Sequence, residues 1–216
     1  GALNTELDWH KIEDDFITKD VPLVCIDGFL SDDALMQMQE FCLSSTIWKR
    51  QYPDAYLAAT IDGGFVSDLH LKITHELNNF LPLILGPLQL VNSVAFKIHP
   101  SCGAGQGLHA DSACVGINLW TTPDDANLDS ESGGVLIYDV LKPDDWVSTN
   151  SSEIAQTYLE GVNYNTTRIP YQCNRAVLFN PSLFHKPEKI KFKTDYENWR
   201  TNITFFYDKP ILSPQP

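Results

Sequence analysis

Short apolar segments separated by turn residues constrain the fold of this chain more than any other feature of its sequence. From residue 88 onward these segments are rich in β-branched and aromatic residues, which favour strands. They cover residues 88–98, 115–120, 135–140, 176–179, 190–192 and 203–207. Regularly spaced short strands of this kind predict an antiparallel sandwich or barrel with helices packed on one side.

The first third of the chain has a helical pattern instead. Ser31 is suited to cap the N-terminus of one helix. A second helix is predicted over residues 67–80, and Pro82 prevents it from continuing. A length of 216 residues fits one domain with a large core. We therefore predict a single α+β, mainly β domain over residues 1–216. Residues 1–87 are its mainly helical support, and residues 88–210 are a β core that carries the functional site.

The charge balance excludes several classes of partner. The chain has 15 basic and 28 acidic residues, a net charge of −13, which disfavours binding to nucleic acids and to anionic membranes. No apolar run approaches the roughly 18 residues of a membrane span. Five widely spaced cysteines without a CxxC motif predict reduced thiols and a cytoplasmic location. A first residue of Gly rather than Met leaves room for a longer parent chain.

His109 and Asp111 form a candidate metal-binding pair. They follow a glycine-rich bend at residues 103–107 and precede a predicted strand, and side chains at i and i+2 of extended backbone project from the same face. His185, just past the strand predicted at residues 176–179, is the natural third ligand. Two neutral imidazoles and one carboxylate form the facial set of non-haem Fe(II) oxygenases. Three positions around the metal then stay open for a bidentate 2-oxo acid and dioxygen.

The last predicted strand carries an arginine in a favourable position. By strand alternation Arg200, Asn202 and Thr204 share one face, while the opposite face is mostly apolar. A single arginine among polar neighbours is suited to bind a buried carboxylate with two parallel hydrogen bonds, a geometry that lysine lacks.

The order of HxD, a distal His and an Arg on the last core strand resembles the Fe(II)- and 2-oxoglutarate-dependent dioxygenase superfamily. The resemblance covers residues 88–208 and looks closest to the prolyl-4-hydroxylase-like branch. That branch has a tyrosine ten residues before the first iron ligand, which contacts the cosubstrate, and a second one on the following strand. Here these positions are His99 and Asn118. With Arg200 and Asn202 they make up the predicted cosubstrate-binding residues.

The resemblance implies a double-stranded β-helix core of the jelly-roll or cupin-like type. It also implies Fe(II) held by His109, Asp111 and His185, with no catalytic residue beyond these ligands. Dioxygen and 2-oxoglutarate are the implied co-reactants, and Arg200 is implied to hold the far carboxylate of 2-oxoglutarate. The implied reaction hydroxylates a C–H bond of an amino acid or peptidyl side chain and releases succinate and CO2.

Two other functions stay open from the sequence. The first is a cupin-like module that binds or senses a metal without turnover. The second is a nucleic-acid oxidative demethylase, because the Arg-x-Asn-x-Thr run at residues 200–204 is similar to that branch, although the net charge disfavours it. The acidic residues of the connection at 121–132 would favour a neutral or cationic small-molecule or peptidyl substrate if that loop covered the metal.

Overall fold

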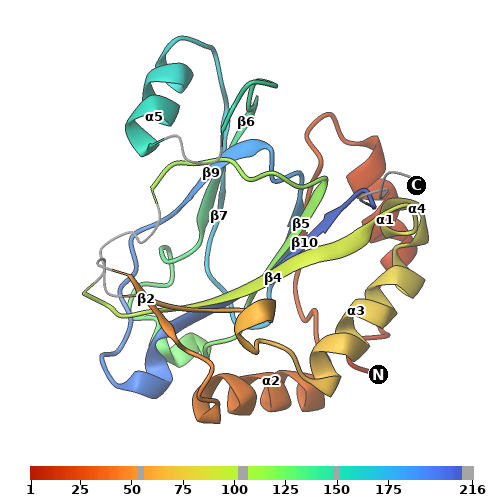
Figure 1. Cartoon of the computed structure of the whole chain (residues 1–216), viewed down its shortest axis with the longest axis vertical. Coiled ribbons are helices and arrows are strands. Elements are labelled where there is room, and N and C mark those ends of the chain that lie inside the picture. The colour runs from red at the N-terminus through yellow and green to blue at the C-terminus, as the bar shows by residue number, and fades with distance from the viewer. Residues whose placement is uncertain (53–55, 102–106, 148–150, 211–216) are drawn as a thin grey trace, which may run out of the picture.

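Two antiparallel sheets form the centre of the computed structural model, which describes residues 1–52, 56–101, 107–147 and 151–210 (Figure 1). The large sheet has the strand order β1-β8-β5-β10-β4-β3-β2 and the small sheet the order β7-β6-β9. The strands of the large sheet are β1 (Leu23–Ile26), β2 (Arg50–Tyr52), β3 (Tyr56–Thr60), β4 (Gln89–Ile98), β5 (Val115–Trp120), β8 (Ala176–Phe179) and β10 (Arg200–Asp208). Those of the small sheet are β6 (Val135–Leu141), β7 (Thr166–Ile169) and β9 (Leu183–Pro187).

From β4 onward the chain passes back and forth between the two sheets. After β4 in the large sheet, His109 pairs with His185 of β9 and so extends the small sheet. The chain then runs through β5 in the large sheet, β6 and β7 in the small one, β8 in the large, β9 in the small and β10 in the large. This alternation places the two sheets face to face, so that side chains from both can line a space between them.

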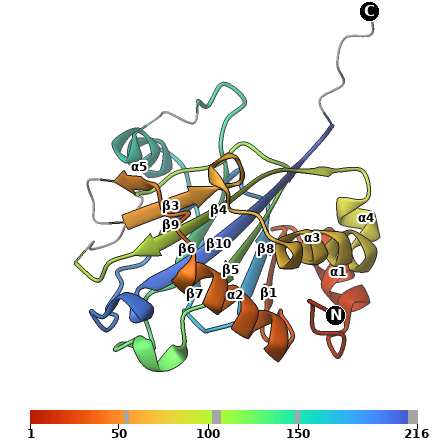
Figure 2. The ribbon, with the colours of Figure 1, turned by 60° about the horizontal axis from the view of Figure 1, so that its bottom comes forward.

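The helices of the N-terminal part cover the face of the large sheet that points away from the small sheet, whereas the helix Ser152–Glu160 packs on Tyr138 and Phe184 of the small sheet (Figures 1 and 2). The helices are α1 (Trp9–Thr18), α2 (Asp32–Ser44), α3 (Asp68–Phe80), α4 (Pro82–Leu85) and α5 (Ser152–Glu160), with short 3-10 helices at Ile61–Gly63, Asp124–Ala126 and Tyr196–Asn198. Met38 of α2 and Leu77 of α3 share one buried cluster with Ile203 and Phe205 of β10. Each such fully buried apolar side chain contributes about 1.5 to 3 kcal/mol to folding.

Within the described part of the chain, none of the helices has both the length and the apolar character needed to cross a membrane.

Several predicted elements match the structure closely. Strands β5 and β8 cover the predicted residues, and β4 begins one residue later than predicted. Helix α3 follows Ser67, whose hydroxyl accepts a hydrogen bond from the His70 amide, and Ser31 caps α2 in the same way through Ala34. The serine side chains satisfy amide groups that have no partner within the helix, which is why they mark helix starts so well.

The structure differs from the sequence prediction at several places, and one of them is β9, a strand that was not predicted. Residues 1–87 contain β1, β2 and β3 besides the predicted helices, and these strands extend the large sheet at both edges. The connection after residue 143 contains α5 and β7. The strand predicted at residues 190–192 is wrong, because Phe192 forms only an isolated bridge with Asn127. Its alternating apolar residues reflect burial of Ile190 and Phe192 in the core between the sheets rather than strand pairing. Residues 102–106 of the glycine-rich bend lie outside the described residues.

His70 is buried in the core between α3 and the large sheet. Its ring lies 5.0 Å from the rings of Phe65 and Phe205, and among the described residues neither ring nitrogen has a hydrogen-bond partner. Burial lowers the pKa of His70 to about 4. The unfolded chain therefore takes up a proton between pH 6.5 and 4 that the folded protein does not, so stability falls as the pH falls through this window.

We expect His70→Leu to remove this acid sensitivity, because leucine fills a similar volume and has no group to protonate. The free energy of unfolding of the variant minus that of the wild type should be about 2 kcal/mol larger at pH 5 than at pH 7.5. Urea unfolding at both pH values measures the difference, with His75→Leu as the control, since His75 is exposed on the same helix. An equal gain at the two pH values would contradict the prediction.

Candidate metal centre

His109 and His185 lie side by side because their backbones pair directly. The His109 amide donates to the His185 carbonyl at 3.0 Å, and the His185 amide donates to the His109 carbonyl at 2.8 Å. The two ring centroids are 4.3 Å apart. Each Nδ1 lies within hydrogen-bond distance of a backbone carbonyl, that of Gly107 at 2.7 Å and that of Leu183 at 2.8 Å. With Nδ1–H donating there, both Nε2 atoms are left with a lone pair for a metal.

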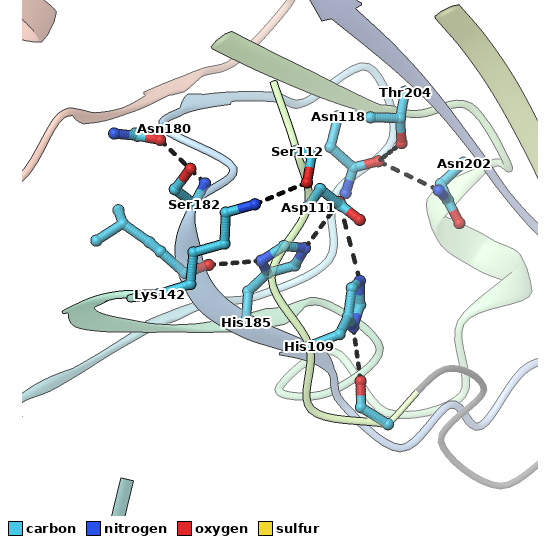
Figure 3. Close-up of polar contacts among 12 residues, drawn as sticks. His109, Asp111, Ser112, Asn118, Lys142, Asn180, Ser182, His185, Asn202 and Thr204 are labelled. Carbon is cyan, nitrogen blue, oxygen red and sulfur yellow. Dashed lines mark hydrogen bonds and ion pairs between the residues drawn. The ribbon is translucent and has the colours of Figure 1, made fainter. Parts of the chain in front are cut away.

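The carboxylate of Asp111 completes the cluster (Figure 3). Its amide donates to the Pro181 carbonyl at 2.8 Å, which ties the segment to the turn before β9. Asp111 Oδ2 lies 4.0 Å from His109 Nε2 and 3.5 Å from His185 Nε2. Ligands at right angles on one ion, each about 2.1 Å from it, are about 3 Å apart, so a small contraction of the cluster would bind a metal. Among the described residues this is the only such group of three.

The protonation states suit a divalent cation. Burial, with a smaller contribution from the neighbouring His185, lowers the pKa of His109 to about 4, so its ring is neutral near pH 7. Burial opposes the ionisation of Asp111, but its hydrogen bond and charge interaction with His185, together with His109 and Lys142, hold its pKa below the usual value. A neutral imidazole and an ionised carboxylate are the forms that coordinate metals. The predicted ligand set therefore fits a facial divalent-metal site.

A cavity of about 260 Å³ between the two sheets contains this cluster and Arg200 together. Its walls come from β3, β4, β5, β6, β8, β9 and β10. The lining residues are Tyr56, Thr60, Asn92, Val94, Phe96, Ile98, His109, Asp111, Asn118, Val135, Val177, Phe179, His185, Pro187, Arg200, Asn202, Thr204 and Phe206. The predicted polar face of β10, with Arg200, Asn202 and Thr204, thus points into the cavity.

Arg200 is a buried cation without a carboxylate partner. It is 2% exposed, and within the described part of the chain it makes no salt bridge. Its Nε donates to the Gly133 carbonyl at 2.6 Å, and its guanidinium carbon lies 5.6 Å and 5.9 Å from the ring centroids of Trp120 and Tyr171. Burial lowers the pKa of Arg200 to about 10, so it still carries its charge at neutral pH. A buried charge of this kind favours an anion that enters the cavity.

A chain of hydrogen bonds connects Arg200 to the middle of the cavity. Arg200 can only donate, and one of its terminal nitrogens donates to Asn202 Oδ1 at 3.1 Å. The amide nitrogen of Asn202 then donates to Asn118 Oδ1 at 3.2 Å, and the Thr204 hydroxyl donates to the same oxygen at 3.3 Å (Figure 3). With its oxygen occupied by two donors, Asn118 has its amide nitrogen left as a donor. The structure therefore brings Asn118 and Asn202 together with Arg200.

The structure does not bring His99 into the cavity. Side chains alternate along β4, and Phe96 and Ile98 face the cavity while Lys97 is buried on the helix side. His99 follows that alternation. Its Nδ1 lies 2.6 Å from the Ser101 hydroxyl, and its ring packs edge-on against Trp199 at 4.7 Å. His99 is not among the residues that line the cavity, so its predicted contact with the cosubstrate stays a prediction that the cavity lining does not support.

The acidic connection at residues 121–132 is not part of the cavity wall either. Asp125 forms an ion pair with Lys193 at 2.8 Å, and Asp124 accepts a hydrogen bond from the Cys173 amide at 2.6 Å. These contacts bind the loop to the edge of the core. Its charge consequently gives no support to a cationic substrate.

Sequence reasoning missed Tyr56, which lines the cavity from β3. The sequence pattern predicts helical support for this region, and only the pairing of β3 with β4 brings the side chain to this face. The aromatic and β-branched residues of 56–60 are the one local signal of a strand there.

No family model matches the chain, and no curated protein matches it in sequence. Several solved structures share its fold. SnoK, a non-haem α-ketoglutarate-dependent carbocyclase from nogalamycin biosynthesis, is 13% identical with a TM-score of 0.64, over 97% of this chain and 87% of its own. A prolyl-4-hydroxylase of Pseudomonas putida is 14% identical with a TM-score of 0.57, over 94% and 99%. HygX of Streptomyces hygroscopicus, with nickel and 2-oxoglutarate bound, is 10% identical with a TM-score of 0.57, over 100% and 91%. At these identities the likeness establishes a shared fold.

Proposed function

We propose that the protein is an Fe(II)- and 2-oxoglutarate-dependent dioxygenase with a jelly-roll core. The observation that carries the proposal is that one cavity contains both a His-Asp-His cluster and a buried arginine that has no carboxylate partner among the described residues. The passage of the chain between two facing sheets supports the jelly-roll core. The fold shared with SnoK, a prolyl-4-hydroxylase and HygX supports the same reaction class.

Each cavity residue has a role in this proposal. His109 and His185 hold the iron through Nε2, and Asp111 offsets part of its charge. Arg200 binds the far carboxylate of 2-oxoglutarate, and Asn118, oriented through Asn202, presents its amide nitrogen to the same ligand. When bound, iron with 2-oxoglutarate and dioxygen supplies oxidative decarboxylation to succinate and CO2 coupled to hydroxylation of a C–H bond. The apolar walls exclude water while these groups hold the reactants in place.

The substrate proposed here is an uncharged part of a small molecule or a peptidyl side chain. Among the lining residues, Asp111 and Arg200 are the only Asp, Glu, Lys or Arg side chains. In this proposal Asp111 binds the metal and Arg200 binds the cosubstrate, so neither is left to bind a charged substrate. The wall at the far end of β10 from Arg200 consists of Thr60, Asn92 and Phe206, which are uncharged. A neutral group bearing hydroxyls or amides fits this wall better than a cation. Two of the structural neighbours, SnoK and HygX, are named for small-molecule chemistry, and a third is a prolyl-4-hydroxylase. These neighbours are therefore compatible with either a small molecule or a peptidyl side chain as the substrate.

The proposal is tested by turnover without a prime substrate. Aerobic incubation with Fe(II) and 2-oxoglutarate is expected to release succinate slowly, and anaerobic mixing is expected to produce the charge-transfer absorption of an iron-bound 2-oxo acid. A cupin-like metal-binding module predicts metal binding that survives Arg200→Ala and no consumption of 2-oxoglutarate. Absence of both succinate and the absorption band would refute the dioxygenase.

A nucleic-acid demethylase is the weaker alternative. Its cavity would need to take a base next to a cationic surface, whereas the chain has a net charge of −13. Oligonucleotide binding that weakens with salt would favour this alternative, and no binding at low salt would remove it.

A further inference from the structure

The segment that carries His109 is held by α5 from the side away from the cavity. The His109 side chain lines the cavity. Its two neighbours in the sequence, Leu108 and Ala110, point the other way, because side chains alternate along extended backbone. Both are buried in one apolar cluster that also contains Leu159 of α5. The position of this helix is therefore linked to the position of a predicted metal ligand.

The first residue of α5 makes a polar contact with the same segment. The Leu108 amide donates a hydrogen bond to Ser152 Oγ at 2.8 Å. Ser152 does not cap its own helix, because the capping hydroxyl is that of Ser151, which accepts from the Ile154 amide. The hydrogen bond of the Ser152 hydroxyl is thus made to the segment that carries His109 rather than to the start of α5.

Ser152 also occupies the space next to Gly107. A Cβ atom at Gly107 would lie 2.6 Å from Ser152 Oγ and 2.7 Å from Ser152 Cβ, which is closer than Cβ atoms in proteins come to other heavy atoms. Apart from the chain neighbours of Gly107, no other described residue has an atom within 4 Å of that position. The φ angle of Gly107 lies outside the left-handed region, so the φ angle does not exclude an alanine. It is the Ser152 side chain that leaves no space for one.

Gly107 in turn orients the metal ligand. Its carbonyl lies 2.7 Å from His109 Nδ1, and an Nδ1–H group that donates there leaves the lone pair of Nε2 for a metal. The Gly107 carbonyl and the Leu108 amide belong to one planar peptide group. Ser152 binds the N–H side of this group, and the His109 ring binds its C=O side. The direction of the carbonyl is therefore set from the side of α5.

We propose that Ser152 is a positioning residue for the metal ligand His109. Its hydroxyl and its packing on Gly107 fix the peptide group whose carbonyl selects the Nδ1–H form of the ring and aims Nε2 at the metal. Loss of a group that supports a metal-binding histidine costs about 10- to 100-fold in metal affinity. Ser152 acts through the backbone, so its loss should cost about tenfold, at the lower end of this range. The inference rests on the proposed function for the identity of the metal.

The first test compares Ser152→Ala with Ser151→Ala by anaerobic calorimetry with Fe(II). Ser152→Ala keeps Cβ and removes the hydroxyl, and it should weaken Fe(II) binding about tenfold. Ser151→Ala makes the same chemical change one residue earlier and removes the helix cap. It should lower the midpoint of thermal unfolding by about 2 to 4 °C and leave the affinity for Fe(II) unchanged.

The metal-free protein gives a second readout. Long-range proton–nitrogen NMR near neutral pH shows which nitrogen of the His109 ring carries the proton. The wild type and Ser151→Ala should show the Nδ1–H form alone, because the Gly107 carbonyl accepts from it. Ser152→Ala should show a mixture of the Nδ1–H and Nε2–H forms, a change that a loss of overall stability does not produce.

A double-variant cycle tests the packing contact. Gly107→Ala places a Cβ against Ser152 and should weaken Fe(II) binding at least about tenfold. In a Ser152→Gly background the same substitution meets no side chain, so it should cause no further loss. Coupling of this kind between two residues in contact shows that they act on the metal site together.

Three outcomes would overturn the inference: wild-type affinity for Fe(II) in Ser152→Ala, an equal loss in Ser151→Ala, or additive losses in the double variant. Thermal unfolding of each metal-free variant shows whether the fold is intact. If the wild type binds Fe(II) but does not consume 2-oxoglutarate, the proposed function fails and the same affinities still decide the role of Ser152. If the wild type binds no Fe(II), both fail.

Discussion

Replacing Asp111 by alanine is expected to lower the affinity for Fe(II) by at least about 100-fold and to stop succinate formation. The carboxylate is the only anionic member of the cluster, and both Nε2 atoms lie within 4.0 Å of its Oδ2. Loss of a group that merely supports a ligand costs about 10- to 100-fold in metal affinity, and loss of a ligand costs more. Anaerobic titration with Fe(II), followed by calorimetry, measures the change.

Asp145→Ala is the matched control, because Asp145 is exposed and does not line the cavity. It removes the same charge from the chain and should bind Fe(II) as the wild type does. The Asp111 variant is expected to remain folded, since the backbone bridge between His109 and His185 does not involve its side chain. Binding of Fe(II) by Asp111→Ala with wild-type affinity would show that the cluster is not the metal site.

Features that depend on side-chain direction along one strand could be predicted from the sequence. Strand alternation indicated that Arg200 and Asn202 share a face, and both line the cavity. The spacing of His109 and Asp111 indicated a shared face, and their ligand atoms lie close together. The same rule separates His99 from Phe96, which does face the cavity. The prediction for His99 came from a family spacing of ten residues, which does not consider the face of the strand.

Features that depend on pairing between distant segments could not be predicted in this way. Strand β1 pairs with β8, and β3 pairs with β4, over separations that no local pattern encodes. These short strands follow or precede helices, so the helical signal dominates the region. Tyr56 enters the cavity only through such a pairing. The segment at residues 190–192 has the opposite problem. Its alternating pattern predicts a strand, but the pattern comes from burial of Ile190 and Phe192 and not from strand pairing.

Replacing Arg200 by methionine is expected to change ligand binding and stability in opposite directions. The affinity for 2-oxoglutarate should fall about 100-fold, because removing one partner of a buried charge pair costs about 2 to 5 kcal/mol. The free energy of unfolding without ligand should be unchanged or higher by about 1 kcal/mol. Arg200 is a buried cation without a carboxylate partner among the described residues, and methionine packs well between the rings of Trp120 and Tyr171.

The loss of the hydrogen bond to the Gly133 carbonyl limits this gain, since one unpartnered carbonyl costs about 1 kcal/mol. Arg175→Met is the control with the reverse pattern. Arg175 forms an ion pair with Asp27 and donates to the Pro170 carbonyl, and it does not line the cavity. That variant should therefore lose stability and keep its affinity for 2-oxoglutarate.

Thermal unfolding with and without 2-oxoglutarate in the presence of Fe(II) separates the two effects. A ligand that binds only the folded state raises the midpoint of unfolding in proportion to the logarithm of its concentration above Kd. The wild type and Arg175→Met should show this rise, and Arg200→Met should not. If Arg200→Met is destabilised as strongly as Arg175→Met and still responds to 2-oxoglutarate, Arg200 supports the fold and does not bind the cosubstrate.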